Sequence, residues 1–171
     1  MSWETPLDYS KISVVNNRPS FFSFDSFTID ENLDMHIEGQ AFIYFTNYDN
    51  INDVTYKAYL IKDADNYVEL NIQNKPNDFN YNEFFNSRYN LTNICFEIND
   101  SLADLEDGEY KMILEINKVD GDKTYVDYIE MTNLVDAILP NVTKDTKNIE
   151  VIEQNVRERM IVKVGTINEE E

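Results

Sequence analysis

Apolar and polar residues alternate with a period of two along most of the chain. Successive side chains of a β-strand point to opposite faces of a sheet, so this alternation predicts strands with one buried face. The clearest case is residues 33–45, which we expect to form one long strand. Its predicted inward positions are Leu33, Met35, Ile37, Gly39, Ala41, Ile43 and Phe45, and its outward positions are Asp34, His36, Glu38, Gln40, Phe42 and Tyr44.

Seven further segments repeat the pattern, and turn-forming residues separate several of them. The segments are residues 54–61, 66–72, 93–98, 110–117, 123–132, 148–153 and 159–164. Residues 62–66 (KDADN) indicate a hairpin loop, and Asp120-Gly121 is the strongest short-range hairpin signal in the chain. About eight strands at short spacing are typical of an antiparallel sandwich. The predicted fold class is therefore all-β, an antiparallel β-sandwich of the Ig-like or jelly-roll-like kind with an N-terminal arm.

Helical patterns are weak by comparison. Residues 82–90 (NEFFNSRYN) and 132–139 (TNLVDAIL) each have room for one or two turns, and Pro140 limits the second. Residues 151–160 have a fair helix propensity, but their apolar residues do not recur at spacings of three and four. We therefore predict a hairpin there, joining the last two strands.

The N-terminal segment differs from the rest because it lacks clean alternation until about Phe22. It holds Trp3, the single tryptophan, and ends in the pair Phe21-Phe22. Two interpretations stay open: an arm that packs on another subunit through Trp3, Phe21 and Phe22, or a first edge strand of the same sandwich. We divide the chain into residues 1–20 (arm or edge strand), 21–165 (β-sandwich domain) and 166–171 (acidic tail).

The amino-acid composition excludes some classes of protein and some kinds of partner. Hydrophobic residues make up 42% of the 171 residues and aromatic residues 13%, too much for a disordered chain. The net charge of −19 repels phosphate backbones and anionic lipid headgroups, so we expect neither nucleic acid binding nor membrane insertion. No stretch approaches the roughly 20 apolar residues of a membrane helix, and the opening residues have no signal-peptide pattern. The expected location is cytoplasmic or virion-associated.

Few residues are candidates for catalysis or for binding a metal or cofactor. His36 is the sole histidine and Cys95 the sole cysteine, so a catalytic triad has no recognisable motif and a zinc site lacks its three or four ligands. Four glycines cannot build a phosphate- or dinucleotide-binding loop. An EF-hand starting at Asp63 fails, because its sixth residue is Val68 and its twelfth is Asn74; only an irregular calcium loop stays open. We predict a non-catalytic protein with no cofactor and no bound metal.

Four motifs occur in an order that resembles a known family. They are IEGQAFI (37–43), KAYLIKDADNYVEL (57–70), FEINDSLADLEDGEY (96–110) and MIVKV (160–164). In this order they resemble the β-sandwich accessory domains of bacterial cell-wall glycopolymer polymerases and glycosyltransferases of the teichoic-acid type, over residues 26–164. The resemblance implies an Ig-like module that works beside such an enzyme. The sequence departs from that pattern in having no attached catalytic domain and an unmatched N-terminal arm.

Residues 105–110 (LEDGEY) contain three acids and a glycine, and they are either a ligand site or a structural corner. Gly108 can adopt the positive φ that a turn before a strand requires. Tyr110 begins the next alternation, and a tyrosine at a sandwich corner can bond its hydroxyl to the backbone. Leu102 and Leu105 would close the end of the sandwich. We interpret the segment as a structural corner.

Two functions remain. The first is a non-catalytic module that binds a cell-surface glycopolymer, such as a cell-wall polysaccharide, or docks onto the enzyme that handles it. Aromatic residues interleaved with Asn in residues 79–89 suit stacking on sugar rings and hydrogen bonding to them. Alternatively, Phe84 and Phe85 only close the core under a long loop. The predicted binding residues are Tyr44, Tyr59, Phe79, Tyr81 and Tyr89, and Phe42 is also expected to be exposed.

The second function is that of a structural subunit of a phage virion, in the capsid, a fibre, the tail or the baseplate. Such a subunit would use the arm and the tyrosine-rich face as interfaces. In either case we expect a protein partner or a homo-oligomer.

Overall fold

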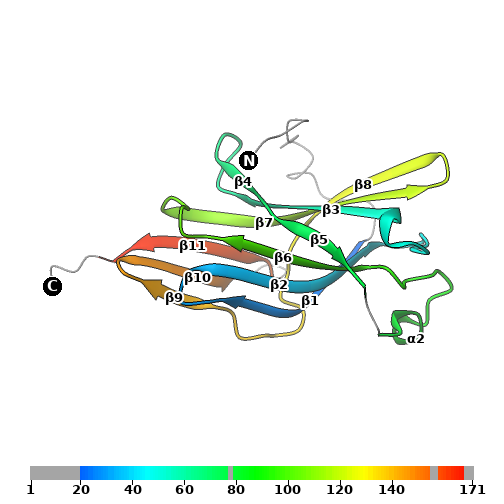
Figure 1. The fold of residues 1–171 in the computed structure, drawn as a ribbon, viewed down its shortest axis with the longest axis horizontal. Helices are drawn as coiled ribbons and strands as arrows, with labels where there is room; N and C mark the ends of the chain where they lie inside the picture. The colour runs from blue at the N-terminus through cyan, green and yellow to red at the C-terminus, as the bar shows by residue number, and fades with distance from the viewer. Residues whose placement is uncertain (1–19, 77–78, 155–157, 168–171) are drawn as a thin grey trace.

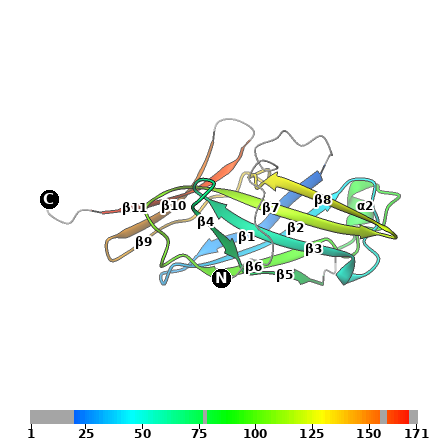
Figure 2. The same cartoon turned by 90° about the horizontal axis from the view of Figure 1, so that it is seen from above.

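In the described part of the chain, eleven β-strands form two antiparallel sheets that pack face to face (Figure 1, Figure 2). The structure is a computed structural model, and it describes residues 20–76, 79–154 and 158–167. Within these residues the predicted all-β antiparallel sandwich is confirmed. The four-stranded sheet contains, in spatial order, β1 (Ser20–Ile29), β2 (Asp34–Ile43), β6 (Cys95–Ser101) and β5 (Ile72–Lys75). The seven-stranded sheet contains β4 (Tyr67–Leu70), β3 (Val54–Ile61), β7 (Gly108–Asp120), β11 (Met160–Thr166), β10 (Lys147–Glu153) and β9 (Asn141–Lys144), and β8 (Lys123–Glu130) also pairs with β7.

Strand β7 is central to the larger sheet because both of its edges pair with other strands. One edge pairs with β3, and the other is shared by β11, opposite residues 108–111, and β8, opposite residues 113–120. The β7–β8 hairpin turns at Gly121, whose φ is 61°, so the hairpin expected at Asp120-Gly121 is confirmed. The hairpins β3–β4 and β10–β11 are also present as predicted.

The core lies between the two sheets and follows the predicted alternation. The inward residues of β2 are buried, as are those of β7 that face them. The core also contains the Tyr56 hydroxyl, which donates to the backbone oxygens of Ala41 and Ile94, at 2.8 and 3.0 Å. These bonds tie β3 to the opposite sheet, because Tyr56 belongs to one sheet and Ala41 to the other.

The LEDGEY segment is the predicted structural corner. Gly108 has a φ of 149°, and the Tyr110 hydroxyl donates to the backbone oxygen of Glu106 at 2.7 Å. Leu102 and Leu105 are buried and close the end of the sandwich. The acids of the segment face solvent, as expected for an exposed corner.

The number of strands differs from the prediction of about eight. Residues 66–72 looked like one strand, yet they divide at Asn71 into β4 and β5, which belong to different sheets. Asn71 holds this crossing by donating its N–H to Asp100 Oδ2 at 2.9 Å and accepting from the Asn99 N–H at 3.0 Å. Strand β9 was missed because its sequence, NVTK, has little apolar alternation. Strand β1 begins at Ser20 and continues beyond the predicted pair Phe21-Phe22 to Ile29.

Helices are short, as expected. In the described residues they are η1 (Ile51–Asp53) and α2 (Tyr81–Phe85), and α2 overlaps one of the two segments predicted to hold a helical turn. The other segment, residues 132–139, is a loop held by the Asn133 amide, which accepts from the Ala137 N–H at 2.9 Å and donates to the Ala137 oxygen at 3.0 Å. Across the residues that the structure describes, no helix has the length and apolar character needed to cross a membrane.

The start of the described chain favours an edge strand over an arm for residues 20–29. Phe22 is 4% exposed and belongs to the core of its own sandwich, which corrects the expectation that it lies at an interface. Phe21 is half-buried and also packs against this core. The predicted arm residue Trp3 and the last four residues of the acidic tail lie outside the described residues.

Candidate binding site

The outer face of the four-stranded sheet changes character from one end to the other. Strand pairing places side chains in rows across it, and one end row is aromatic, Phe21 opposite Phe42. The next row is Ser23, Gln40, Cys95 and Lys75, and the following rows contain Glu38 with Glu97 and His36 with Asn99. A face that is aromatic at one end and polar along the rest can contact a ligand by both stacking and hydrogen bonding.

The segment 79–91 is positioned over the aromatic end of this face. Asn80 caps the start of helix α2, its side chain accepting the Glu83 N–H at 3.1 Å, and Asn86, directly after the helix, has the left-handed conformation. The Asn82 side chain then fixes the returning chain, donating to the Tyr89 oxygen at 2.5 Å and accepting the Leu91 N–H at 2.9 Å. Both views place α2 at one end of the sandwich (Figure 1, Figure 2).

Further hydrogen bonds attach this segment to the chain that follows β2. The Asn90 N–H donates to Asn47 Oδ1 at 2.8 Å, and the Tyr48 N–H donates to the Asn90 oxygen at 2.6 Å. The Asn93 amide donates to the Tyr48 oxygen at 3.0 Å. The two loops are therefore held at a fixed separation before any ligand arrives.

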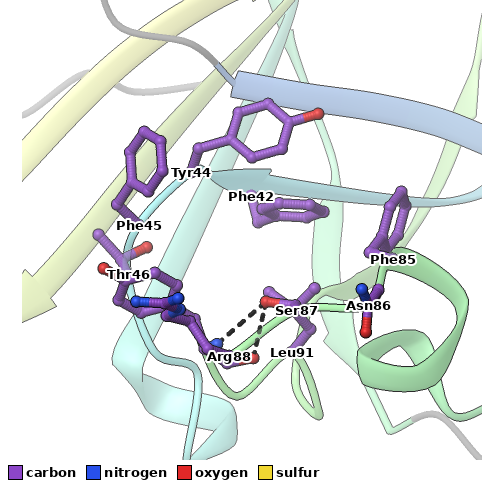
Figure 3. Close-up of a pocket in the computed structure, with 10 residues that line it drawn as sticks. Phe42, Tyr44, Phe45, Thr46, Phe85, Asn86, Ser87, Arg88 and Leu91 are labelled. Atoms are coloured by element: carbon purple, nitrogen blue, oxygen red, sulfur yellow. Dashed lines mark hydrogen bonds between the residues drawn. The ribbon is translucent and has the colours of Figure 1, made fainter.

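Between the two loops lies a pocket of about 620 Å³ (Figure 3). Such a volume is typical of small-molecule sites. Its lining residues come from the end of β2 and the residues that follow it, and from the end of α2 and the residues that follow it. They are Phe42, Tyr44, Phe45, Thr46, Phe85, Asn86, Ser87, Arg88, Tyr89 and Leu91.

Five of the ten residues that line the pocket are aromatic. Phe42 and Phe85 are edge-to-face with centroids 5.4 Å apart, and Phe42 makes a similar contact with Tyr44 at 5.1 Å. Phe45 and Tyr89, which also line the pocket, are edge-to-face with centroids 6.1 Å apart. Phe42 is 2% exposed and forms the floor, whereas Phe45 is 70% exposed. The pocket thus offers ring faces at several orientations.

Phe45 has an unusual backbone. Its φ is 67°, in the left-handed region that residues with bulky side chains rarely adopt. The neighbouring backbone is fixed by Thr46 and Tyr48, since the Thr46 hydroxyl donates to the Ile43 oxygen at 2.7 Å and the Ile43 N–H donates to the Tyr48 hydroxyl at 2.7 Å. Strained residues held this way concentrate at ligand-binding positions.

Polar groups are also present in the pocket. The Ser87 hydroxyl donates to the Tyr89 oxygen at 3.0 Å and accepts the Tyr89 N–H at 3.0 Å, as the dashed lines in Figure 3 show. Among the described residues, neither the Asn86 amide nor the Arg88 guanidinium has a hydrogen-bond or ion-pair partner. Both side chains can therefore donate hydrogen bonds to a ligand.

A second hollow, of about 310 Å³, lies on the other side of α2. Tyr81 and Phe79 border it, together with Lys75 and Glu38, which form an ion pair. The hydrogen bond from Lys75 lowers the pKa of Glu38 and raises that of Lys75, while burial raises the pKa of the Tyr81 hydroxyl. At neutral pH this hollow therefore contains a charged pair and a protonated phenol.

His36, Glu38 and Glu97 bring three possible ligand atoms within 4.8 Å of one another. The Asn99 Oδ1 atom lies 2.5 Å from His36 Nδ1, and Lys75 already bonds to Glu38. A lysine ammonium bonded to a carboxylate competes with a cation there, so we assign no metal to these residues. That the chain binds no metal stays a prediction.

The structure brings together four of the five predicted binding residues. Tyr44 and Tyr89 line the first pocket, and Phe79 and Tyr81 border the second hollow. Tyr59 does not belong with them: it is on the seven-stranded sheet and only 1% exposed, packed with Ile61 and Ile113. The expectation that Tyr59 is exposed is wrong, as is the same expectation for Phe42.

Sequence reasoning missed Phe45 and Arg88. Phe45 was assigned to the inward face because alternation was extended two residues too far, past the end of β2 at Ile43. Arg88 lies inside the aromatic segment 79–89 but was not selected. Its position, directly before a predicted binding tyrosine, was the available signal.

Comparisons with known proteins support the fold. No protein-family model and no curated protein matches the chain. Among solved structures, the crystal structure of S. aureus TarS is similar to it, with a TM-score of 0.53 and 9% sequence identity, over 87% of this chain. The match covers 25% of TarS. At this identity the likeness shows a related domain fold and nothing about residues or activity.

Proposed function

We propose that this chain is a non-catalytic module that binds sugar rings of a cell-surface glycan in the aromatic pocket. The observation that carries the proposal is the pocket itself, in which Phe45, Tyr89 and Tyr44 surround a preformed opening. The apolar face of a pyranose ring packs on such rings, and its hydroxyls take hydrogen bonds from groups such as Asn86 and Arg88.

Charge narrows the kind of glycan. The chain has a net charge of −19, which disfavours contact with a polyanionic backbone. A neutral sugar avoids this repulsion and still gains from stacking. N-acetylglucosamine is a suitable probe, because it has a flat apolar ring face together with an acetamido group that can bond to amide and guanidinium donors.

The likeness to part of TarS agrees with this role. TarS is a teichoic acid glycosyltransferase, and we infer that the present chain works beside an enzyme that handles a cell-wall glycopolymer. The alternative of a virion subunit depended in part on an N-terminal arm, and residues 1–19 lie outside the described residues.

The test is titration of the full chain with chitobiose, the disaccharide of N-acetylglucosamine, followed by NMR. Binding should be lost or weakened about tenfold in Phe45→Ala and Tyr89→Ala, which corresponds to about 1.4 kcal/mol per stacking ring. Leu134→Ala is the control, since Leu134 is also exposed, at 55%, but does not line the pocket. No binding of chitobiose, or equal effects of Phe45→Ala and Leu134→Ala, would contradict the proposal.

A further inference from the structure

The aromatic pocket and the second hollow lie along the same strand. Phe42 lines the pocket and Glu38 the hollow, and both side chains are on the outer face of β2. At the usual rise of a strand, the four residues from Phe42 to Glu38 span about 13 Å. This separation exceeds the size of one sugar ring, so a single ring cannot reach both places.

Contacts between aromatic rings connect the residues that line the two sites. Phe84 and Phe79, in and before α2, are 67% and 55% exposed, and their ring centroids are 5.8 Å apart. Phe84 contacts Phe85 of the pocket at 4.9 Å, and Phe79 contacts Tyr81 of the hollow at 4.7 Å. An unbroken series of rings therefore leads from one site to the other. A contiguous exposed apolar surface of this kind indicates a binding site, because contact between apolar rings and water is unfavourable.

We propose that the pocket, this ridge and the hollow are successive subsites of one groove for a linear, neutral glycan chain, an inference that rests on the function proposed above. The ridge rings stack on the sugars that cross α2. In the hollow, the carboxylates of Asp25 and Glu38 accept hydrogen bonds from sugar hydroxyls, and these bonds are stronger than neutral ones. The net charge of −19 repels a polyanion, so the chain that fits this groove is neutral.

The experiment measures affinity against ligand length with chitooligosaccharides, from the disaccharide to the hexasaccharide. For the unchanged protein, the dissociation constant should fall at least about tenfold along this series as the ridge and hollow become occupied. In Phe79→Ala and Phe84→Ala, most of the gain with length should disappear. Phe84→Tyr keeps the ring and should restore the gain. These rings are exposed, so the variants should fold, which a circular dichroism spectrum checks.

Each outcome separates this inference from the proposed function. If chitobiose binds and Phe45→Ala weakens it, but longer oligomers bind no better, the pocket stands and the extended groove is refuted. The groove is also refuted if the gain with length survives both alanine substitutions. If chitobiose binding does not depend on Phe45, the proposed function itself has failed, whatever the effect of length.

Discussion

Replacing Gly39 by alanine tests how closely β1 approaches β2 beneath the second hollow. A Cβ atom built on Gly39 would lie 2.6 Å from the backbone oxygen of Ser23 and 2.9 Å from Cζ of Phe96. Neither neighbour can move freely. The Ser23 oxygen is a backbone atom of β1, close to the β-bulge between Phe24 and Ser26, and the Phe96 ring is fully buried. The substitution must therefore displace β1 or the core ring.

The expected loss follows from two opposing effects. Overpacking of a well-packed core costs about 1–3 kcal/mol, and contact with backbone places Gly39→Ala near the upper end. Alanine also lowers the conformational entropy of the unfolded chain relative to glycine, which stabilises the folded state by about 0.4–1 kcal/mol. The net effect should be a decrease of about 2 kcal/mol in the free energy of unfolding.

Two other glycines separate the steric from the conformational effect. At Gly165 in β11, an alanine Cβ would meet no heavy atom within 4 Å and φ is not positive, so Gly165→Ala should change stability by less than about 0.5 kcal/mol. Gly121 has equal space but a φ of 61°, so Gly121→Ala should cost about 1 kcal/mol through backbone strain alone.

The assay is urea unfolding followed by circular dichroism. With a slope of about 2 kcal/mol per molar urea, Gly39→Ala should lower the midpoint by roughly 1 M. If its midpoint equals that of Gly165→Ala, the close approach of β1 and β2 is not present in solution, and the reasoning is refuted.

Two further predictions concern the corner and the charged pair. Tyr110→Phe removes the hydroxyl bonded to the Glu106 backbone and should lower stability in urea by about 1 kcal/mol, without a change in chitobiose binding; no loss would show that the corner bond is not formed. The pKa of Glu38 is lowered in the folded state, first by its hydrogen bond from Lys75, so the ion pair stabilises the fold above the usual glutamate pKa of about 4.3 and is lost as pH falls through the lowered value. The difference in stability between the unchanged protein and Glu38→Gln should therefore shrink in acid; a difference that grows as pH falls would contradict this.

Alternation along the chain was sufficient to predict most of the strands and the core. The inward set of β2 from Met35 to Ile43 is buried because one face of that strand packs on the opposite sheet along its whole length. The corner at LEDGEY was also predictable, because its geometry depends on residues within the segment itself. Gly108 permits the positive φ of the turn, and the Tyr110 hydroxyl bonds to the backbone of Glu106, four residues earlier. These elements depend on residues that are close together in the sequence, so sequence patterns are sufficient to predict them.

Features that depend on distant contacts were not predictable in the same way. The alternation of residues 66–72 continues through Asn71, yet the chain changes sheets there because the Asn71 backbone bonds to Asp100 and Asn99. Tyr59 was placed on an exposed face, but the outer face of the seven-stranded sheet has a small apolar cluster of its own around it. Period two distinguishes the two faces of a strand and does not show whether the second face is also covered.

The binding pocket lies at the end of β2, where a residue at an outward position of the strand is nevertheless buried. Phe42 is at an outward position of β2, and an aromatic residue on a polar face remains exposed unless another segment covers it. The segment 79–91 provides that cover through Phe85, but the left-handed turn at Asn86 carries the chain away before it closes over Phe45 and Tyr44. The cover is therefore incomplete, and the uncovered rings form a pocket rather than more core. An apolar residue at an outward strand position, together with a long aromatic loop elsewhere in the chain, is accordingly the sequence signal that would have located this site.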